Sequence, residues 1–434
     1  MNILIATIGT RGDVQPYLAL AMGLKAAGHD VTICTCPRYR TFVFNYGIGF
    51  LPLEEGLLEL LETEFGRSIV ESLNGVFGVL RSIPKVMEKT GAIYRRMVDD
   101  CWAATEALNP DMIIYHPKLF CVPAFAAVRK IPAILAMLCP FHVPTGESPL
   151  FGPSLGRFYN RWTYRMVHLL TKLGTRGYLR DWRSRHDQNG LSQHSNPTQI
   201  SPGHSIPVIH AYSQSVCPRP SDWPDNATVT GYWFLPQETA HGSRWHPSSE
   251  LLAFLEAGPP PVYFGFGSMA GTDPITVTQM ILSAVEKANV RAIISTGWGG
   301  IVPFESSPNI YVLEFAPHSW LFPKMAAVVH HGGAGTTAAG LRAGCPTIIC
   351  PFGVDQPFWG RRVAELGAGI APIPQKELTD TLLANAILRV TNDQSFCASA
   401  KSVADAIAQE NGIAQAIKTI EQCGSSAIAV GVPT

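Results

Sequence analysis

The sequence has few of the features that mark metal-binding, membrane-spanning or nucleic-acid-binding proteins. Its 10 cysteines include no Cys-x-x-Cys pair and no Cys/His spacing typical of zinc sites, so we expect no metal and reduced, mostly buried thiols. No apolar stretch approaches the ~20 residues that span a bilayer. Basic and acidic residues are equal at 33 each, so no overall charge attracts nucleic acid. These absences predict a soluble, cytoplasmic protein.

The sequence also lacks both common nucleotide-binding fingerprints, yet one glycine-rich stretch has the pattern of a phosphate site. The apolar residues 326–329 lead into HHGGAGTT at residues 330–337, and an alanine-rich helical pattern follows. No lysine follows the glycines, and their spacing is not G-x-G-x-x-G. A strand, a tight loop and a helix N-terminus direct backbone N–H groups and the positive end of the helix dipole to one point. The stretch therefore predicts a site for a diphosphate-bearing ligand.

The N-terminal residues have the pattern of a strand, a glycine loop and a helix. We expect a buried strand over residues 3–8, with no basic leader or cleavage site of a signal peptide, and GTRGD follows at residues 9–13. In the helix that follows, we expect Asp13 to be the N-cap and Pro16 to lie in the first turn, where its missing N–H costs nothing. A second strand is expected over residues 31–36. This order predicts a doubly wound parallel sheet with ligands at the carboxyl ends of its strands.

The same order recurs in the second half of the chain, which predicts two domains. VYFGFGSM at residues 262–269 is again a strand that leads into a glycine loop, and 434 residues exceed what one core usually supports. Proline, serine and glycine collect between the halves, as in a linker. We therefore assign residues 1–235 to a first domain, 236–260 to a linker and 261–410 to a second domain. Residues 411–434 form a C-terminal helix, which we expect to pack back on the first domain, and a patternless tail.

Two long helical regions are expected in the first half. Apolar positions at helical spacing extend over residues 57–108. The second region, residues 152–186, combines aromatic residues with many arginines. Such a helix is typical of a contact with anionic lipid, and also of a solvated cationic face backed by core aromatics, which is the commoner case. The composition leaves both interpretations open.

Taken together, the motifs resemble those of a known family. GTRGDVQP at residues 9–16, HHGGAGTT at 330–337 and the Asp-Gln pair at 355–356 have the order and separation found in UDP-sugar-dependent glycosyltransferases of the GT-B fold. PHSWLFP at 317–323 and AGCPT at 343–347 are similar to the sterol 3-beta-glucosyltransferases, and bacterial glycosyltransferases of glycopeptide and macrolide aglycones are also similar. The resemblance implies an α/β protein of two doubly wound, Rossmann-like domains that face each other across a cleft. The N-terminal domain would bind the acceptor and the C-terminal domain the UDP-sugar.

The activity implied by this resemblance is an inverting transfer of a hexose. The donor would be a UDP-sugar, most simply UDP-glucose, and the acceptor a hydroxyl of a lipophilic molecule such as a sterol or terpenoid, so the product would be a β-glycoside. Asp13 would accept the proton of that hydroxyl; an aspartate of ordinary pKa is a weak base, and a plain helix cap is the alternative interpretation. The residues implied in donor binding are Arg11, Gly12, Ser268, Phe315, His318, His331, Gly333, Gly335, Thr336, Asp355 and Gln356.

Most of these donor residues surround the glycine-rich stretch. His331 would bond the pyrophosphate, and the backbone at Gly335 with the Thr336 hydroxyl would complete the cradle at the helix start. Ser268, in the glycine loop of the second half, is placed to reach the same phosphates, although it also suits an ordinary turn. The pair at residues 355–356 would receive the sugar hydroxyls. No metal or cofactor is implied, because the helix dipole and His331 would stabilise the leaving diphosphate.

The base and the acceptor would be held by aromatic side chains. Phe315 would stack on uracil and the region of His318 would bond its edge. Phe141 and His142, with the apolar helices of residues 57–108, would line the acceptor pocket. The same residues also suit a hydrophobic core, and the sequence does not separate these interpretations.

Several other functions suit the same motifs. The acceptor could be a flavonoid, a macrolide or another natural-product aglycone. A nucleotide-sugar 2-epimerase shares the two-domain fold and the diphosphate site, and a non-catalytic auxiliary protein of a glycosyltransferase shares the fold. Under the leading interpretation we expect a monomer that binds a UDP-sugar and a lipophilic acceptor, with no nucleic acid and with a peripheral membrane contact left open.

Overall fold

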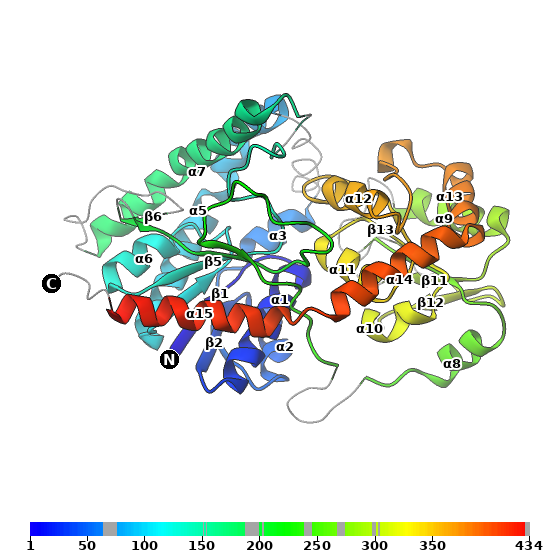
Figure 1. Cartoon of the computed structure of the whole chain (residues 1–434), viewed down its shortest axis with the longest axis horizontal. Helices are drawn as coiled ribbons and strands as arrows, with labels where there is room; N and C mark the ends of the chain where they lie inside the picture. The colour runs from blue at the N-terminus through cyan, green and yellow to red at the C-terminus, as the bar shows by residue number, and fades with distance from the viewer. Residues whose placement is uncertain are drawn as a thin grey trace.

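The chain folds into two lobes, each built on a parallel sheet with helices on both faces (Figure 1). The computed structural model describes residues 1–63, 76–150, 152, 154–186, 199–201, 204–237, 245–266, 274–296, 301–302 and 304–429. The prediction of two doubly wound α/β domains is confirmed. The exact domain boundaries stay a prediction.

Seven parallel strands form the sheet of the first lobe, in the order β3-β2-β1-β4-β5-β8-β9. A separate antiparallel pair joins β6 to β7. The elements of this lobe are β1 (Asn2–Ala6), α1 (Arg11–Ala26), β2 (Asp30–Thr35), α2 (Arg40–Phe44), β3 (Gly49–Pro52), α3 (Gly56–Glu62), α5 (Val76–Leu108), β4 (Met112–Tyr115), α6 (Val122–Arg129), β5 (Ala133–Met137), α7 (Arg157–Arg185), β6 (Gln199–Ser201), β7 (His204–Ser205), β8 (Val208–His210) and β9 (Ala227–Val229).

Five parallel strands form the sheet of the second lobe, in the order β12-β11-β10-β13-β14. The elements from the second lobe to the end of the chain are α8 (Ser249–Glu256), β10 (Val262–Gly265), α9 (Pro274–Ala288), β11 (Ala292–Ser295), β12 (Ile310–Leu313), α10 (His318–Leu321), β13 (Ala327–His330), α11 (Ala334–Arg342), β14 (Thr347–Ile349), α12 (Gln356–Glu365), α13 (Asp380–Asn392), α14 (Gln394–Ala408) and α15 (Gly412–Ala429).

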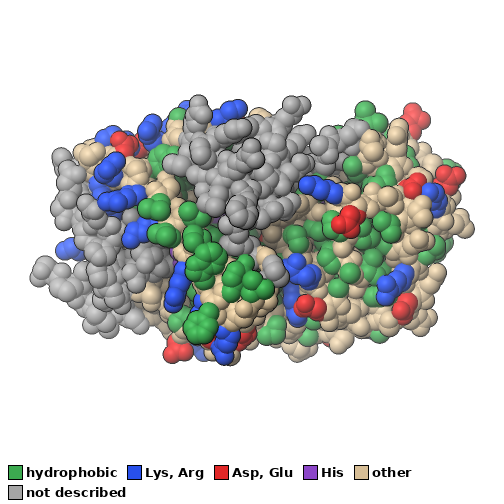
Figure 2. Space-filling model, turned by 90° about the horizontal axis from the view of Figure 1, so that it is seen from above, with side chains coloured by type: hydrophobic (Ala, Val, Ile, Leu, Met, Phe, Trp, Pro, Cys, Tyr) green, Lys and Arg blue, Asp and Glu red, His purple; other side chains and the backbone are tan. Residues whose placement is uncertain are grey.

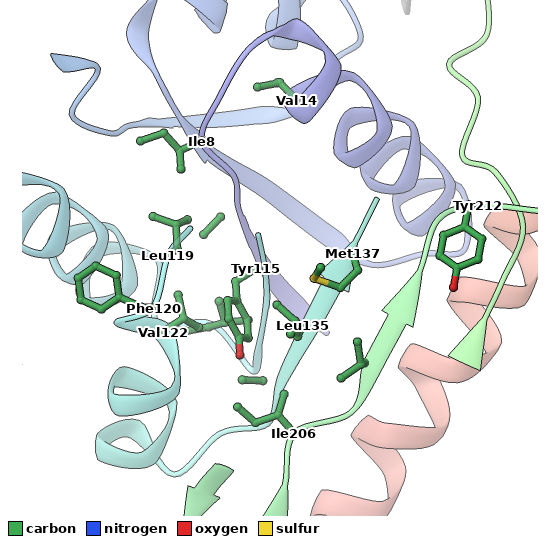
Figure 3. Packing of buried hydrophobic residues seen from close by; sticks show 14 of the residues in the cluster. Ile8, Val14, Tyr115, Leu119, Phe120, Val122, Leu135, Met137, Ile206 and Tyr212 are labelled. Atoms are coloured by element: carbon green, nitrogen blue, oxygen red, sulfur yellow. The ribbon is translucent and has the colours of Figure 1, made fainter. Parts of the chain in front are cut away.

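Both faces of the first sheet are covered, which explains why its central strands β1, β4 and β5 are almost continuously apolar. Along β1, Leu4 belongs to the core on one face, and Ile3 and Ile5 belong to the core on the other. Figure 3 shows how Tyr115 and Leu135, from neighbouring strands, pack together within the first of these cores. Because β1, β4 and β5 are neighbours and run parallel, the loops that follow them lie at one edge of the sheet.

The last helix, α15, returns from the second lobe to the first. In Figure 1 it lies along the first lobe, where its Gly424 lies close to Met1. Ala416 and Ile420 join the core that contains Leu24 of α1. Gly23 makes the approach possible, because a Cβ at this position would lie 2.3 Å from a methyl group of Ile413. The packing of α15 couples the two lobes beyond the single connection between them.

Three segments differ from the expectations. The range 236–260, expected to be a linker, contains α8, because Leu251 finds a hydrophobic partner in the core of the second lobe. The tail expected to lack a pattern continues α15 as far as Ala429. Helix α12 was not expected at all. Its start after a proline-containing loop gave no apolar periodicity, and burial of Trp359 between the lobes stabilises it.

Candidate active site

Asp13 lies at the start of α1, at the carboxyl edge of the first sheet. Thr10 is the N-cap and Asp13 is the third helical residue, so the expectation that Asp13 is the N-cap is wrong. Asp13 Oδ2 accepts a hydrogen bond from the Thr10 backbone N–H at 2.8 Å, which forms half of a capping box. Gly9 is required here, since a Cβ would fall 2.0 Å from that oxygen. Pro16 lies inside the helix, not in its first turn, and removes one helical hydrogen bond.

Two residues that the sequence did not single out hold the Asp13 carboxylate. His116 directly follows β4, which pairs with β1 in the sheet. Its Nδ1 accepts a hydrogen bond from the Lys118 backbone N–H at 3.2 Å. The neutral ring therefore carries its proton on Nε2, which lies 3.3 Å from Asp13 Oδ1 and donates to it. The Lys118 ammonium lies 3.4 Å from Oδ2. The sequence feature that could have identified His116 is its position directly after a strand, β4, that lies next to β1.

These contacts decide the charge of the pair. Burial alone acts to raise the pKa of Asp13, but the charge of Lys118 and the hydrogen bonds from His116 and Thr10 outweigh it and hold the pKa well below its usual range. Burial lowers the pKa of His116, with a partly opposing effect of Asp13. At neutral pH the pair is therefore a carboxylate and a neutral imidazole. This carboxylate is a weak base that becomes effective only late in a proton transfer.

The glycine-rich stretch forms the carboxyl edge of the second sheet. His330 ends β13, and its Nδ1 accepts the Gly332 N–H at 2.9 Å, with Gly332 at φ +94°. Gly333 is the N-cap of α11. Gly335, in the first turn, is exposed, and an added Cβ would meet nothing within 4 Å. The first N–H groups of this helix have no intrahelical acceptor, which leaves them for an anion.

His331 and Thr336 lie at the same helix start. Burial lowers the pKa of His331 to about 4, against a hydrogen bond to the backbone of Gly265, so the imidazole is neutral at pH 7. Its Nδ1 is buried, with no partner in the part of the chain that the structure describes. An unpartnered buried nitrogen costs free energy, which a ligand that bonds it would recover. Ser268 lies outside the described residues.

Arg11 connects the two lobes. Its guanidinium carbon lies 4.7 Å from the ring centroid of Phe42 in the first lobe and 5.1 Å from that of Phe315 in the second. Phe315 is 48% exposed, so one aromatic face remains for a ligand. Gly12 follows Arg11 on the exposed side of the helix start. His318 stacks on Phe322, at 4.2 Å between centroids, and burial lowers its pKa to about 4, with smaller effects of Arg11 and His331.

Asp355 and Gln356 begin α12. Asp355 Oδ2 accepts from Trp359 Nε1 at 3.0 Å, and burial raises the pKa of Asp355 to about 6. Asp13 raises this pKa further and Lys118 lowers it. Phe358, in the same helix, packs on Phe141 of the first lobe at 5.2 Å between ring centroids, so the start of α12 lies at the lobe interface. The Gln356 side-chain oxygen Oε1 accepts the Phe352 N–H at 2.7 Å and so holds the loop before α12.

The loop after β5 contains the two acceptor candidates, whose side chains lie in different surroundings. Phe141 packs edge-to-face on Phe358 of α12, at 5.2 Å, and so contacts the second lobe. His142 instead faces His168 of α7 at 4.8 Å. The Nε2 atoms of both imidazoles are buried without a partner among the described residues, and burial lowers the pKa of His142 to about 3. The structure therefore places Phe141, and not His142, beside the lobe interface.

The described residues contain no group of three or more His, Cys, Asp or Glu side chains placed to hold a metal ion. Within the same part of the chain, none of the helices combines the length and the apolar content needed to traverse a bilayer.

Comparisons with known proteins agree with this geometry. Residues 3–108 match the family described as glycosyltransferase family 28 N-terminal domain, and residues 270–422 match the erythromycin biosynthesis protein CIII-like, C-terminal domain. Among solved structures, the glycotransferase of kitacinnamycin has a TM-score of 0.67 at 19% identity, over 97% of this chain and 98% of that one. The glycosyltransferase VinC, solved with dTDP, has a TM-score of 0.65 at 19% identity, over 98% and 100%. These similarities define the GT-B glycosyltransferase fold.

Similarity in sequence narrows the class. A sterol 3-beta-glucosyltransferase of Arabidopsis thaliana, UGT80B1, is 34% identical over 96% of this chain and 67% of its own length. The sterol 3-beta-glucosyltransferase of Emericella nidulans is 35% identical over 97% of this chain and 30% of its own length. The chain thus spans less than a third of the fungal relative. It belongs to the glycosyltransferase family that includes the sterol 3-beta-glucosyltransferases, as its motifs predicted.

Proposed function

We propose that this protein transfers glucose from UDP-glucose to the hydroxyl of a sterol or a similarly flat, lipophilic alcohol, with inversion at the anomeric carbon. The observation that carries the proposal is the pair of facing groups at the two sheet edges. Asp13, held by His116 and Lys118, lies on one side, and Asp355 with the N-terminus of α11 lies on the other. A base and a diphosphate site on opposite sides suit an in-line displacement.

In the proposed reaction, the acceptor hydroxyl lies against Asp13 Oδ1 and attacks the anomeric carbon while UDP leaves from the opposite face. The C–O bond to the acceptor forms, the C–O bond to the diphosphate breaks, and the hydroxyl proton passes to the carboxylate. Because His116 and Lys118 stabilise the charged form of Asp13, the proton moves late, after negative charge has left the donor with UDP. The α11 N-terminus and the Arg11 cation stabilise that charge.

The donor site is proposed on the other side. Phe315 offers an exposed ring to uracil, His331 Nδ1 and the first-turn N–H groups of α11 hold the diphosphate, and Asp355 accepts hydrogen bonds from the glucose hydroxyls. Gln356 holds the loop beside the sugar through its side-chain oxygen, which accepts the Phe352 N–H. We propose no cofactor and no metal. The protein would act as a cytoplasmic monomer in peripheral contact with a membrane.

The test is a transfer assay with purified protein. UDP-glucose is incubated with cholesterol or ergosterol held in cyclodextrin, and the product is examined by NMR. The proposal expects a sterol β-glucoside and release of UDP. A panel of triterpenoid, flavonoid and macrolide acceptors tests the natural-product alternative. Conversion of UDP-glucose to another UDP-sugar without any acceptor would instead establish a 2-epimerase.

A further inference from the structure

The outer face of α7 combines exposed apolar side chains with cations. Phe158 is 92% exposed and Leu173 58%, although side chains of these types are usually buried. At about 100° per residue, eight of the exposed positions fall within an arc of about 100°, which makes one stripe along the helix. The residues of this α7 stripe are Phe158, Trp162, Arg165, Leu169, Lys172, Leu173, Arg176 and Arg180.

The charge of the helix is strongly one-sided. Along 29 residues it carries eight lysines and arginines and one acidic residue, Asp181. Arg185 is paired with Asp99 at 2.8 Å, away from the stripe. Arg165, Lys172 and Arg180 are exposed and form no ion pair with residues that the structure describes. Figure 2, seen from the side on which α7 lies, shows basic and hydrophobic side chains next to one another on the first lobe.

The helix is firmly attached beneath this stripe. Tyr164 and Trp182 lie on another face of the helix, about 130° from the centre of the stripe, and are buried in the first lobe. In Figure 1, α7 is the outermost element on its side of that lobe. A helix anchored by one face presents the other as a fixed surface, so exposure of the stripe follows from the fold.

The aromatic end of the stripe is fastened to the loop that carries the acceptor candidates. Asn160 Nδ2 donates to the Gly146 carbonyl at 2.8 Å. The Asp222 carboxylate accepts from the Thr145 hydroxyl at 2.6 Å, from the Gly146 N–H at 2.7 Å and from Arg161 at 2.8 Å. Phe158 and Trp162 therefore lie next to the loop after β5, where an acceptor would enter.

We infer that the α7 stripe docks the protein on an anionic lipid bilayer, with the aromatic and leucine side chains in the interface and the cations at the headgroups. The stripe has the composition of an interfacial amphipathic helix. A second copy of the chain fits poorly, because a twofold contact would place these cations against themselves. The inference specifies the membrane contact of the proposed function. It also explains how an acceptor with little solubility in water reaches the loop after β5.

Vesicle flotation of the purified full chain tests this inference. We expect binding to phosphatidylcholine vesicles that contain phosphatidylglycerol, weak binding to pure phosphatidylcholine, and loss of binding at high salt. The triple variant Arg165→Gln/Lys172→Gln/Arg180→Gln should lower the partition coefficient by about five-fold per cation removed. The double variant Phe158→Ser/Trp162→Ser should lower it by about ten-fold or more.

Matched controls come from exposed residues on other surfaces. Lys376→Gln/Lys401→Gln/Lys418→Gln makes the same change in net charge, and Leu252→Ser/Leu382→Ser removes two exposed apolar side chains. Both should bind vesicles as the wild type does. Equal binding by the α7 variants and the wild type would overturn the inference, and so would a dimer, seen by sedimentation, that the Phe158→Ser/Trp162→Ser variant dissociates.

Transfer assays separate this inference from the proposed function. With the sterol held in cyclodextrin, the α7 variants should keep wild-type rates, whereas with the sterol in anionic vesicles their rates should fall with binding. If the wild type binds vesicles through α7 but transfers no sugar, the docking surface stands and the proposed function fails.

Discussion

The two facing sheet edges differ in the charge and in the hydrogen bonding of their polar groups. At the first edge, the Asp13 carboxylate is charged and both of its oxygens are engaged, by Thr10, His116 and Lys118. At the second, His331 is buried and neutral, and its Nδ1 has no partner among the residues that the structure describes. It lies beside a helix start whose first N–H groups have no intrahelical acceptor. Among the described residues, the first edge is satisfied without a ligand, and the second is not. The Asp13 carboxylate must stay available for reaction, whereas the helix start beside His331 must gain free energy when it binds a ligand.

The largest effect is expected at the satisfied edge. Asp13→Asn should lower kcat by about 10²- to 10⁴-fold, because it removes the proton acceptor, and should leave UDP affinity nearly unchanged. Steady-state kinetics and calorimetry with UDP measure the two effects. Asp393→Asn is the control, since Asp393 is an exposed N-cap of α14 far from the site. Wild-type kcat in Asp13→Asn would remove this residue from the mechanism.

The next effect is expected at the unsatisfied edge. His331→Ala should weaken UDP binding by roughly ten- to a hundred-fold, the cost of one hydrogen bond to a charged group. Because the free imidazole has a pKa of about 4 and a bound diphosphate raises it, wild-type binding should take up protons between pH 5 and 7. Calorimetry in two buffers of different ionisation enthalpy measures this uptake. His246→Ala, at an exposed position, is the control, and unchanged UDP affinity in His331→Ala would contradict the cradle.

A smaller effect is expected at Lys118, whose charge stabilises the carboxylate form of Asp13. Lys118→Met removes the charge that lowers the Asp13 pKa most, so this pKa should rise and the acid limb of the kcat profile should move to higher pH. At pH 7.5 we expect a change in kcat of no more than about ten-fold. Lys401→Met, on the exposed face of α14, should leave the profile in place. An acid limb that stays in place in Lys118→Met would show that the Lys118 charge does not lower the pKa of Asp13.

The smallest effect concerns Asp355. Its pKa of about 6 is raised by burial, so the carboxylate is charged at pH 7.5 and mostly protonated at pH 5.5. The KM for UDP-glucose should therefore rise a few-fold over this interval as the carboxylate loses charge. Asp355→Asn should have a raised KM with no such dependence on pH. A KM in that variant that still varies with pH would assign the titration to another group.

Local pattern was enough to predict most strands and the residue types at both edges. Strands β1, β2 and β13 fell within a residue or two of their expected positions, because buried parallel strands are largely apolar. Helix α12 was missed, since its stabilisation comes from Trp359 in a core shared by both lobes. Helix α8 was likewise not expected, since its packing depends on Leu251 in the core of the second lobe.

The candidate site shows the same limit at the level of single residues. Asp13 was identified from its motif, but its cap position was wrong by three residues, because a capping box and a plain N-cap differ only in backbone conformation. His116 was missed because only the strand order brings it to Asp13. Strand β4 lies next to β1, although more than a hundred residues separate them in the sequence. The cation of Arg11 between Phe42 and Phe315 likewise requires two lobes.

The sequence by itself determined the family, the two parallel sheets and the chemistry available at each strand end, since apolar runs and glycine loops act locally. Only the tertiary structure decided which charges meet. The low pKa of Asp13, the raised pKa of Asp355 and the exposed stripe of α7 all depend on burial and on neighbours distant in the chain. The physical reason is that electrostatic energies depend on distance and solvent access, and the local sequence determines neither of them.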